Sequence, residues 1–212
     1  GDIMPVSRRL ELVNYSAAHG SLVIEDDFEN EFVYLQKPTP SLFGLAGGQN
    51  VVYLGTFSRL LLPSIRISFM VLPPELSALY RKKADQYNQT ASKAEQIALC
   101  QFIRDGHLAA QTRKLKRLYS VKLKALRSAV REVFGKDSQI QTGAAGTSLA
   151  LTLSTTLTWQ ELQKKAQTNG LRLQLLREAP GKITLILSCS SMPVADFVPA
   201  CKLLKNISQI QN

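Results

Sequence analysis

Two short polar runs in this sequence combine the residue types of a ligand site with a spacing that brings them together. Residues 25–27, "EDD", follow the apolar run "LVI", and Thr56, Ser58 and Arg59 follow the apolar run "VVYL". Arg66 comes seven residues after Arg59. If the two apolar runs form neighbouring parallel strands, both polar runs lie at the C-terminal edge of the sheet, where α/β proteins bind ligands.

These side chains suit a phosphorylated, heteroaromatic ligand. Hydroxyl groups at Thr56 and Ser58, backbone N–H groups of a turn and the guanidinium of Arg66 can hold a phosphate. A carboxylate such as Asp26 can hold a protonated ring nitrogen, which is how an enzyme keeps pyridoxal phosphate electron-withdrawing. The same residues also suit a structural network of acids and bases that caps loops at strand ends. Residue types and spacing leave both interpretations open.

A helix and three apolar strands are the elements that must position these residues. Pro5 in the first turn and Gly20 as the stop predict a helix over residues 5–19. Apolar runs predict strands over residues 21–27, 50–58 and 65–72. Their continuous rather than alternating pattern favours a sheet that is covered on both faces. Helix, strand, loop and strand in this order predict an α/β architecture with parallel neighbours.

Helices dominate the next part of the chain, and a different pattern follows them. Helices are predicted over residues 73–88, 92–106 and 107–134. Strands and helices then alternate as in a compact α+β layer, over residues 148–155, 158–170, 171–176, 182–189 and 193–208. Thr158 followed by Glu161 predicts a capping box at the start of one of these helices. The boundary between the two parts is expected near residue 110.

Composition excludes several classes of protein. In the 212 residues, no apolar run reaches the ~20 residues that span a bilayer. The N-terminus has no signal-peptide core, so we expect a cytoplasmic protein without a membrane partner. Three cysteines without a Cys-x-x-Cys pair and only two histidines, His19 and His107, argue against a metal site. Cys100, Cys189 and Cys201 are therefore predicted to be small buried residues in a reducing cytosol.

The net charge of +10 is concentrated in the helix predicted over residues 107–134. Basic residues run from Arg113 to Arg131 without an acid among them, and they include Lys114, Lys116, Arg117, Lys122, Lys124 and Arg127. Such a stripe can meet a phosphate backbone. Apolar residues recur every three or four positions from Leu115 to Val133, so the stripe also suits the solvated face of a helix that packs inward. No aromatic residues interleave for base stacking, which argues against single-strand binding.

The sequence over residues 3–130 resembles a known family. The segments that carry the resemblance are "IMPVSRRLEL", "VIEDDFENEFVY", "PTPSLFGL", "NVVYLGTFSR", "LLPSIRISFMVLPPEL" and "AEQIALCQFIRDGHL". They resemble the aminotransferase-type domain of MocR regulators, which are GntR-family transcription factors with a class I/II aminotransferase-like effector domain of fold type I. The resemblance implies the second part of a large domain in residues 1–110, with three α/β/α layers and a mostly parallel sheet. It implies a small α+β domain in residues 111–212.

Several positions match the cofactor site of that family. The resemblance implies that Asp26 pairs with the pyridine nitrogen of pyridoxal phosphate. It implies that Ser58 and Arg66 hold the phosphate, with Thr56 nearby. The Gly-rich phosphate loop, the stacking aromatic and the asparagine that the first half of such a domain supplies are not in this sequence.

Three positions depart from the family. Phe28 stands where a tyrosine bonds the phenolic oxygen of the cofactor, and Arg59 stands where a lysine forms the Schiff base. Ser191 aligns with the arginine that clamps the substrate carboxylate. Transamination needs a neutral amine at position 59, and a guanidinium stays protonated in proteins. We therefore expect no catalytic residue here, and non-covalent binding of pyridoxal phosphate at most.

Two functions follow as hypotheses. The first is an effector-sensing and oligomerisation domain, or fragment, of a MocR-type transcription regulator, which is not catalytic. The alternative is a pyridoxal-phosphate-dependent class I/II aminotransferase with an unusual Arg59. Partial sheets expose edges and apolar faces, so a homodimer or other homo-oligomer is expected. The resemblance implies an amino acid or a pyridoxal-phosphate-like compound as effector, and DNA as a partner through an N-terminal domain that this sequence lacks.

Overall fold

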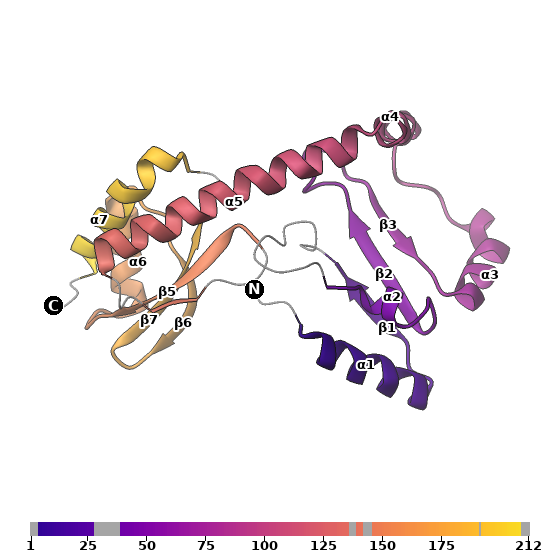
Figure 1. The fold of residues 1–212 in the computed structure, drawn as a ribbon, viewed down its shortest axis with the longest axis horizontal. Helices are drawn as coiled ribbons and strands as arrows, with labels where there is room; N and C mark the ends of the chain where they lie inside the picture. The colour runs from indigo at the N-terminus through magenta and orange to yellow at the C-terminus, as the bar shows by residue number, and fades with distance from the viewer. Residues whose placement is uncertain (1–3, 28–38, 136–138, 142–145, 191, 209–212) are drawn as a thin grey trace. The chain divides into compact units, whose positions relative to one another are not determined.

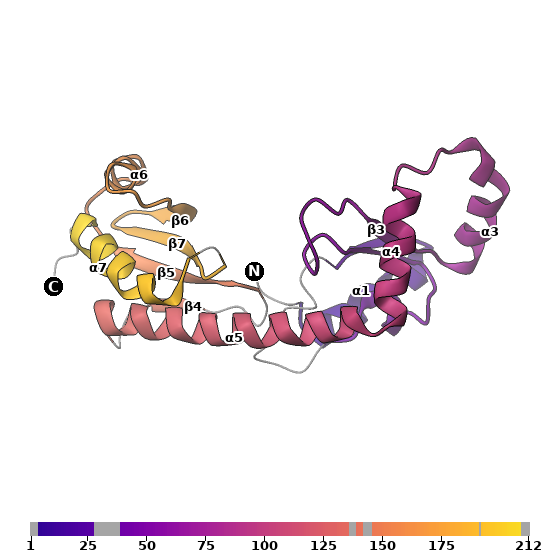
Figure 2. The same cartoon turned by 90° about the horizontal axis from the view of Figure 1, so that it is seen from above.

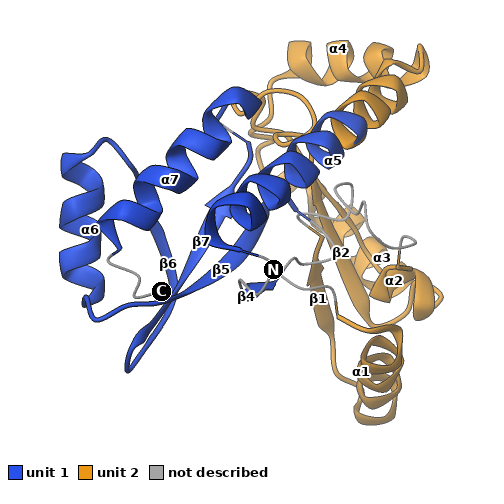
Figure 3. Ribbon diagram, turned by 60° about the vertical axis from the view of Figure 1, so that its left-hand side comes forward, with its two compact units in different colours: residues 1, 117–212 blue, residues 2–116 orange. Residues whose placement is uncertain are grey.

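A computed structural model describes most of the chain (Figure 1), namely residues 4–27, 39–135, 139–141, 146–190 and 192–208. The chain divides into two compact units, an N-terminal unit of residues 2–116 and a C-terminal unit of residues 117–212 (Figure 3). Helix α5 (His107–Phe134) runs from one unit into the other. The boundary expected near residue 110 stays a prediction. Each unit has its own sheet and its own core.

Helix α1 (Val6–His19) opens the N-terminal unit; it begins one residue later than the sequence predicts and ends at the predicted residue. Pro5 stands at its N-terminal cap, where the missing N–H of proline costs no helical hydrogen bond. Gly20 ends it in the left-handed conformation, with φ of 61°, and its N–H donates to the carbonyl of Ser16. Both signals are local, which is why the sequence alone was sufficient to place them.

The sheet of the N-terminal unit has three strands, β1 (Val23–Asp26), β2 (Val51–Thr56) and β3 (Ser68–Val71), in the order β1-β2-β3. β1 and β2 are parallel, as predicted. β3 is antiparallel to β2 and exposed at all four positions, so the prediction of parallel, doubly covered strands is wrong for β3. Residues 57–67 are too short to connect two parallel strands. Such strands need a crossover connection of about a dozen residues or more, usually a helix.

Four shorter elements complete the N-terminal unit: α2 (Leu42–Leu45), α3 (Pro74–Lys83), the 3-10 turn η2 (Ala84–Gln86) and α4 (Lys93–Arg104). α2 contacts both α1 and β2. α3 and α4 bury no residue fully. The buried apolar residues of this unit are few and lie mainly around β2: Leu42, Val51, Val52, Leu60 and Ile67.

The C-terminal unit is an antiparallel sheet with helices. Its strands are β4 (Gln139–Gln141), β5 (Ser148–Ser154), β6 (Gln174–Ala179) and β7 (Lys182–Ser188), in the order β4-β5-β7-β6. Its helical elements besides α5 are α6 (Trp159–Thr168), the short turn η3 (Val194–Asp196) and α7 (Phe197–Ile207). The sequence predicted these elements except β4, with η3 and α7 as one helix over residues 193–208, and it placed β6 three residues too early.

Buried residues at every second position of β5 and β7 form the core of this unit. Leu151 pairs with Leu185 and Leu153 pairs with Ile183, and all four side chains are buried. Helices α5, α6 and α7 contribute buried residues as well: Leu123, Leu126, Ala129, Val130, Leu162, Ala166, Phe197, Cys201 and Leu204. α7 lies along α5 in two views (Figure 1, Figure 2). Burial of one strand face and three helix faces gives this unit a larger core than its neighbour.

The predicted capping box is present at the start of α6. The N–H of Glu161 donates to Oγ1 of Thr158, and the carboxylate of Glu161 accepts from the N–H and the hydroxyl of Thr158 at 2.8 Å each. These two hydrogen bonds stabilise the ionised carboxylate and lower the pKa of Glu161 below its ordinary value.

The three cysteines differ in exposure. Cys189 and Cys201 are buried as predicted, but Cys100 is exposed, because it lies on α4, which packs only loosely. Burial raises the pKa of Cys189, and burial together with nearby Glu132 raises the pKa of Cys201 to about 11. The thiolate is the reactive form of cysteine. Burial and the raised pKa therefore both lower the reactivity of Cys189 and Cys201.

At most one of the three thiols, Cys100, should therefore react rapidly with Ellman's reagent in the native protein at pH 8, and all three should react after denaturation. A Cys100→Ser variant should show almost no rapid reaction before denaturation. Rapid reaction of two or three thiols in the native protein would contradict the burial of Cys189 and Cys201.

Candidate functional site

The two predicted polar runs meet at one edge of the N-terminal sheet. Asp26 at the end of β1 pairs with Leu54 of β2, and the N–H of Asp27 donates to the carbonyl of Leu54 at 3.1 Å. Thr56 ends β2 two residues further on. Side chains two residues apart on a strand share a face, so the register puts Asp26 and Thr56 on the same face of the sheet. The strand pairing expected from the sequence thus brings both runs together.

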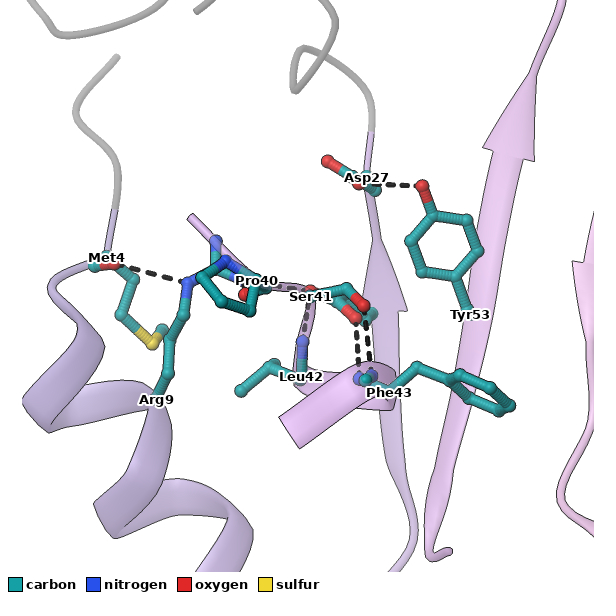
Figure 4. Close-up of polar contacts among 10 residues, drawn as sticks. Met4, Arg9, Asp27, Pro40, Ser41, Leu42, Phe43 and Tyr53 are labelled. Carbon is teal, nitrogen blue, oxygen red and sulfur yellow. Dashed lines mark hydrogen bonds and ion pairs between the residues drawn. The ribbon is translucent and has the colours of Figure 1, made fainter. Parts of the chain in front are cut away.

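The acidic run is divided between two roles. Glu25 is 8% exposed, and its carboxylate accepts from the N–H groups of Leu42 and Phe43, at 2.8 and 3.0 Å. The guanidinium of Arg9 donates to the same carboxylate at 3.0 Å. α1, β1 and the first turn of α2 meet at this carboxylate, and Figure 4 labels its partners Arg9, Leu42 and Phe43. Glu25 is therefore a structural carboxylate that joins three elements.

Asp27 also has a partner, whereas Asp26 has none among the residues that the structure describes. The hydroxyl of Tyr53 donates to Asp27 at 2.7 Å (Figure 4). Asp26 is exposed and has no hydrogen bond or ion pair with described residues. Of the three acids, Asp26 is the one whose carboxylate is free of such contacts and can meet a ligand.

The segment after β2 forms a turn that is closed by internal hydrogen bonds. The N–H groups of Leu60 and Leu61 donate to the carbonyl of Phe57. The N–H of Ser58 donates to Oγ1 of Thr56 at 3.2 Å, and the hydroxyl of Ser58 donates to the carbonyl of Ile65 at 2.5 Å. A serine hydroxyl has one proton to donate. Ser58 can therefore donate to a phosphate only if it leaves Ile65.

The two arginines of the turn differ in their surroundings. Arg59 is half-buried and engaged with other parts of the chain. Arg66 is exposed and has no hydrogen bond or ion pair with described residues. The sequence predicted Arg66 at the start of a strand. The structure places it two residues before β3. The other two predicted positions, Phe28 and Ser191, lie outside the described residues.

Pyridoxal phosphate fits these residues only in part. Asp26 and Arg66 offer a carboxylate for a ring nitrogen and a guanidinium for a phosphate. A lysine for covalent attachment is missing, because residues 39–81 contain none and Arg59 stays protonated. A covalent bond to the cofactor would therefore need an amine that residues 39–81 do not supply.

Sequence reasoning missed the part that Gly55 plays at this edge. Phe69 on β3 pairs with Gly55 and lies with its ring over it, tilted against the rings of Tyr53 and Phe57 at centroid distances of 6.1 and 5.3 Å. A Cβ atom at Gly55 would lie 2.6 Å from Cε1 of Phe69 and closer still to Cζ. Glycine is required here because an aromatic ring occupies the space of a side chain.

Gly55→Ala should therefore lower the free energy of unfolding by about 1–3 kcal/mol, because the ring of Phe69 must move off its two neighbours. In a Phe69→Ala background the same substitution should cost less than about 0.5 kcal/mol. Urea unfolding of the four proteins of this double-mutant cycle measures both values. An equal cost in the two backgrounds would contradict the close contact.

Similarity to known proteins extends over nearly the whole chain. No protein-family model matches it. It is 32% identical to the uncharacterized HTH-type transcriptional regulator YdeL of Bacillus subtilis, over 97% of this chain and 45% of that protein. It is 30% identical to the probable rhizopine catabolism regulatory protein MocR of Rhizobium meliloti, over 83% of this chain and 36% of that protein.

A solved structure shows the fold. The α-aminoadipate aminotransferase LysN of Thermus thermophilus, complexed with N-(5'-phosphopyridoxyl)-L-leucine, matches with a TM-score of 0.79 at 24% identity. The match covers 99% of this chain and 55% of LysN. The chain thus spans less than half the length of the two regulators and about half of the enzyme. The partial aminotransferase-like fold expected from the sequence is confirmed.

Proposed function

We propose that this chain, which belongs to the aminotransferase-like part of the MocR-type transcription regulators, binds a small-molecule effector and does not catalyse transamination. One observation carries the proposal. The turn that follows β2 holds Arg59 where the resemblance requires a lysine, and residues 39–81 contain no lysine that could replace it. A protonated guanidinium is neither a nucleophile nor a base.

The effector is proposed to be an anion, such as an amino acid or a compound like pyridoxal phosphate. Asp26 and Arg66 support this choice, since both are exposed and neither has a hydrogen bond or ion pair with the described part of the chain. A guanidinium can bind a carboxylate or a phosphate with two parallel hydrogen bonds, while a carboxylate such as Asp26 accepts from an amine or a protonated ring. Binding in this manner needs no covalent bond.

A second copy of the chain is the proposed protein partner. Apolar side chains are exposed on β1, β3, α3 and α4, and they include Ile24, Met70, Leu79, Tyr80 and Ile97. β3, α3 and α4 line a hollow of about 1000 Å³. Exposed apolar surface on this scale is typical of interaction sites. DNA contact in the intact regulator is proposed to come from a helix-turn-helix domain outside this chain, because the similar regulators are named as HTH-type proteins.

Thermal denaturation with added pyridoxal phosphate or amino acids tests the effector proposal. A ligand at 100 times its dissociation constant stabilises the native state by about 2.7 kcal/mol. Asp26→Ala and Arg66→Ala should each remove most of that stabilisation, whereas Arg81→Ala on the exposed end of α3 should retain it. Equal stabilisation of all four proteins would place the ligand elsewhere and overturn the assignment of Asp26 and Arg66.

The alternative function is a pyridoxal-phosphate-dependent aminotransferase of class I/II. It is favoured by the likeness of the fold to LysN and by Asp26 and Arg66, which match the cofactor site of the resemblance. Half-transamination by the full-length protein separates the two functions. The wild type should show no turnover of an amino donor. Turnover by the wild type would establish the enzyme.

A further inference from the structure

The charge of the chain is unevenly divided between its two units. Residues 117–212 contain 13 Lys and Arg against 5 Asp and Glu, a net charge of +8, whereas residues 1–116 contain 13 against 11, a net charge of +2. Part of the excess lies on α5, where no acid occurs between Asp105 and Glu132. A surplus of this size on one compact unit indicates a polyanionic partner.

Four cations of the C-terminal unit form a basic stripe on α5: Arg117, Lys124, Arg127 and Arg131. They are spaced by seven, three and four residues, so at about 100° per residue they fall within an arc of about 80° on one side of the helix. All four are exposed. None has a hydrogen bond or ion pair with the residues that the structure describes. Glu132, at the end of the helix, is the acid nearest to them in sequence.

Another side of α5 packs into the core of the C-terminal unit. Leu123, Leu126, Ala129 and Val130 are buried and lie outside the arc of the basic stripe. Lys122 lies outside the stripe, and its ammonium group donates to the carbonyl of Ser190 at 3.1 Å. An amphipathic helix that binds a membrane inserts its apolar face, and here that face belongs to the core. Apart from Leu118 and Val121, the exposed side chains of α5 in this unit are polar or charged.

We propose that the basic stripe of α5 binds the phosphate backbone of a DNA duplex. At a rise of about 1.5 Å per residue, Arg117 and Arg131 are about 21 Å apart along the helix. Duplex DNA carries one charge per about 1.7 Å of its axis, so each of the four cations can reach a phosphate. Single strands are bound by aromatic residues together with cations, and the stripe contains no aromatic residue.

The contact is independent of sequence, because it involves phosphates rather than base edges. It adds a second DNA surface to the helix-turn-helix domain proposed above. The choice of DNA rather than RNA rests on the proposed function, whereas the choice of a polyanion rests on the charges alone. Binding by the stripe needs no effector, so failure of the effector titration and failure of this proposal are separate results.

Fluorescence anisotropy of a labelled DNA duplex of arbitrary sequence tests the proposal, with the whole chain and a series of salt concentrations. Each phosphate contact contributes about −0.9 to the slope of log K against log salt. The variant R117Q/K124Q/R127Q/R131Q should therefore lose about three to four units of slope and bind at least about tenfold more weakly at low salt. Circular dichroism of each variant verifies that α5 is still helical.

The control variant R81Q/K82Q/K83Q/K93Q removes the same charge from exposed positions on α3 and α4. It should retain the slope of the wild type. Equal losses in the two variants would overturn the proposal, because net charge alone would then explain binding. Tighter binding to duplex RNA, to single-stranded DNA or to vesicles of phosphatidylserine and phosphatidylcholine would also overturn it.

Discussion

Replacing Glu25 with alanine should lower the free energy of unfolding of the N-terminal unit by about 3–5 kcal/mol. The substitution removes the acceptor of two backbone N–H groups, those of Leu42 and Phe43. It also leaves the guanidinium of Arg9, whose side chain is 17% exposed, without its carboxylate. A charge that stays behind without its partner in a buried site is strongly destabilising.

The neighbouring Asp26→Ala is the matched control. Asp26 is exposed and has no partner among the described residues, so its loss should change stability by less than about 0.5 kcal/mol. Urea unfolding followed by far-UV circular dichroism measures both variants. Fluorescence of Trp159, the one tryptophan of the chain, reports on the C-terminal unit, and its transition should not shift. Similar costs for Glu25→Ala and Asp26→Ala would contradict the division of roles.

Leu185→Ala should have the corresponding effect on the C-terminal unit, with a loss of about 2–5 kcal/mol. Leu185 is fully buried on β7, which lies between β5 and β6. Truncation of such a side chain loses its transfer free energy and leaves a cavity. The Trp159 transition should shift to lower urea concentration.

Leu176→Ala on β6 removes the same atoms from a side chain that is 52% exposed. It should cost less than half as much, because water already reaches the leucine. Equal costs for the two leucines would contradict the assignment of β7 as the centre of the core. Together with Glu25→Ala, these variants show whether the two units unfold in separate transitions.

Elements with strong local signals could be predicted from the sequence. Pro5 and Gly20 delimit α1, and Thr158 with Glu161 begins α6. The apolar period of three to four residues predicted α5 with its observed limits. In each case, residues close together in the chain determine the backbone conformation. The alternation of β5 and β7 is similarly clear, because one face of each strand is buried.

Features that depend on distant residues could not be predicted. Glu25 and Asp26 are adjacent acids, and only the position of α2 decides which of them is buried. The direction of β3 depends on how residues 57–67 turn back, and the exposure of Cys100 depends on the loose packing of α4. The bond from the hydroxyl of Ser58 to Ile65 likewise joins residues that no local motif connects.

The candidate site was predicted in its topology but not in its contacts. The strand ends meet as expected, and Asp26 and Arg66 are the members with exposed charges and no partners among the described residues. Arg59 remains the decisive residue, because its chemistry separates a sensor from an enzyme. Charge at this position can attract an anion, but a guanidinium is not the nucleophile that transamination requires.

Borohydride reduction after incubation with pyridoxal phosphate tests this claim most directly, in the full-length protein that contains this chain. Peptide mass spectrometry then locates any phosphopyridoxyl group and gives its stoichiometry. We predict no stoichiometric adduct on the wild type and one adduct per chain, at position 59, on the Arg59→Lys variant. A stoichiometric adduct on the wild type, or none on Arg59→Lys, would contradict the account of a cofactor turn that has lost only its reactive amine.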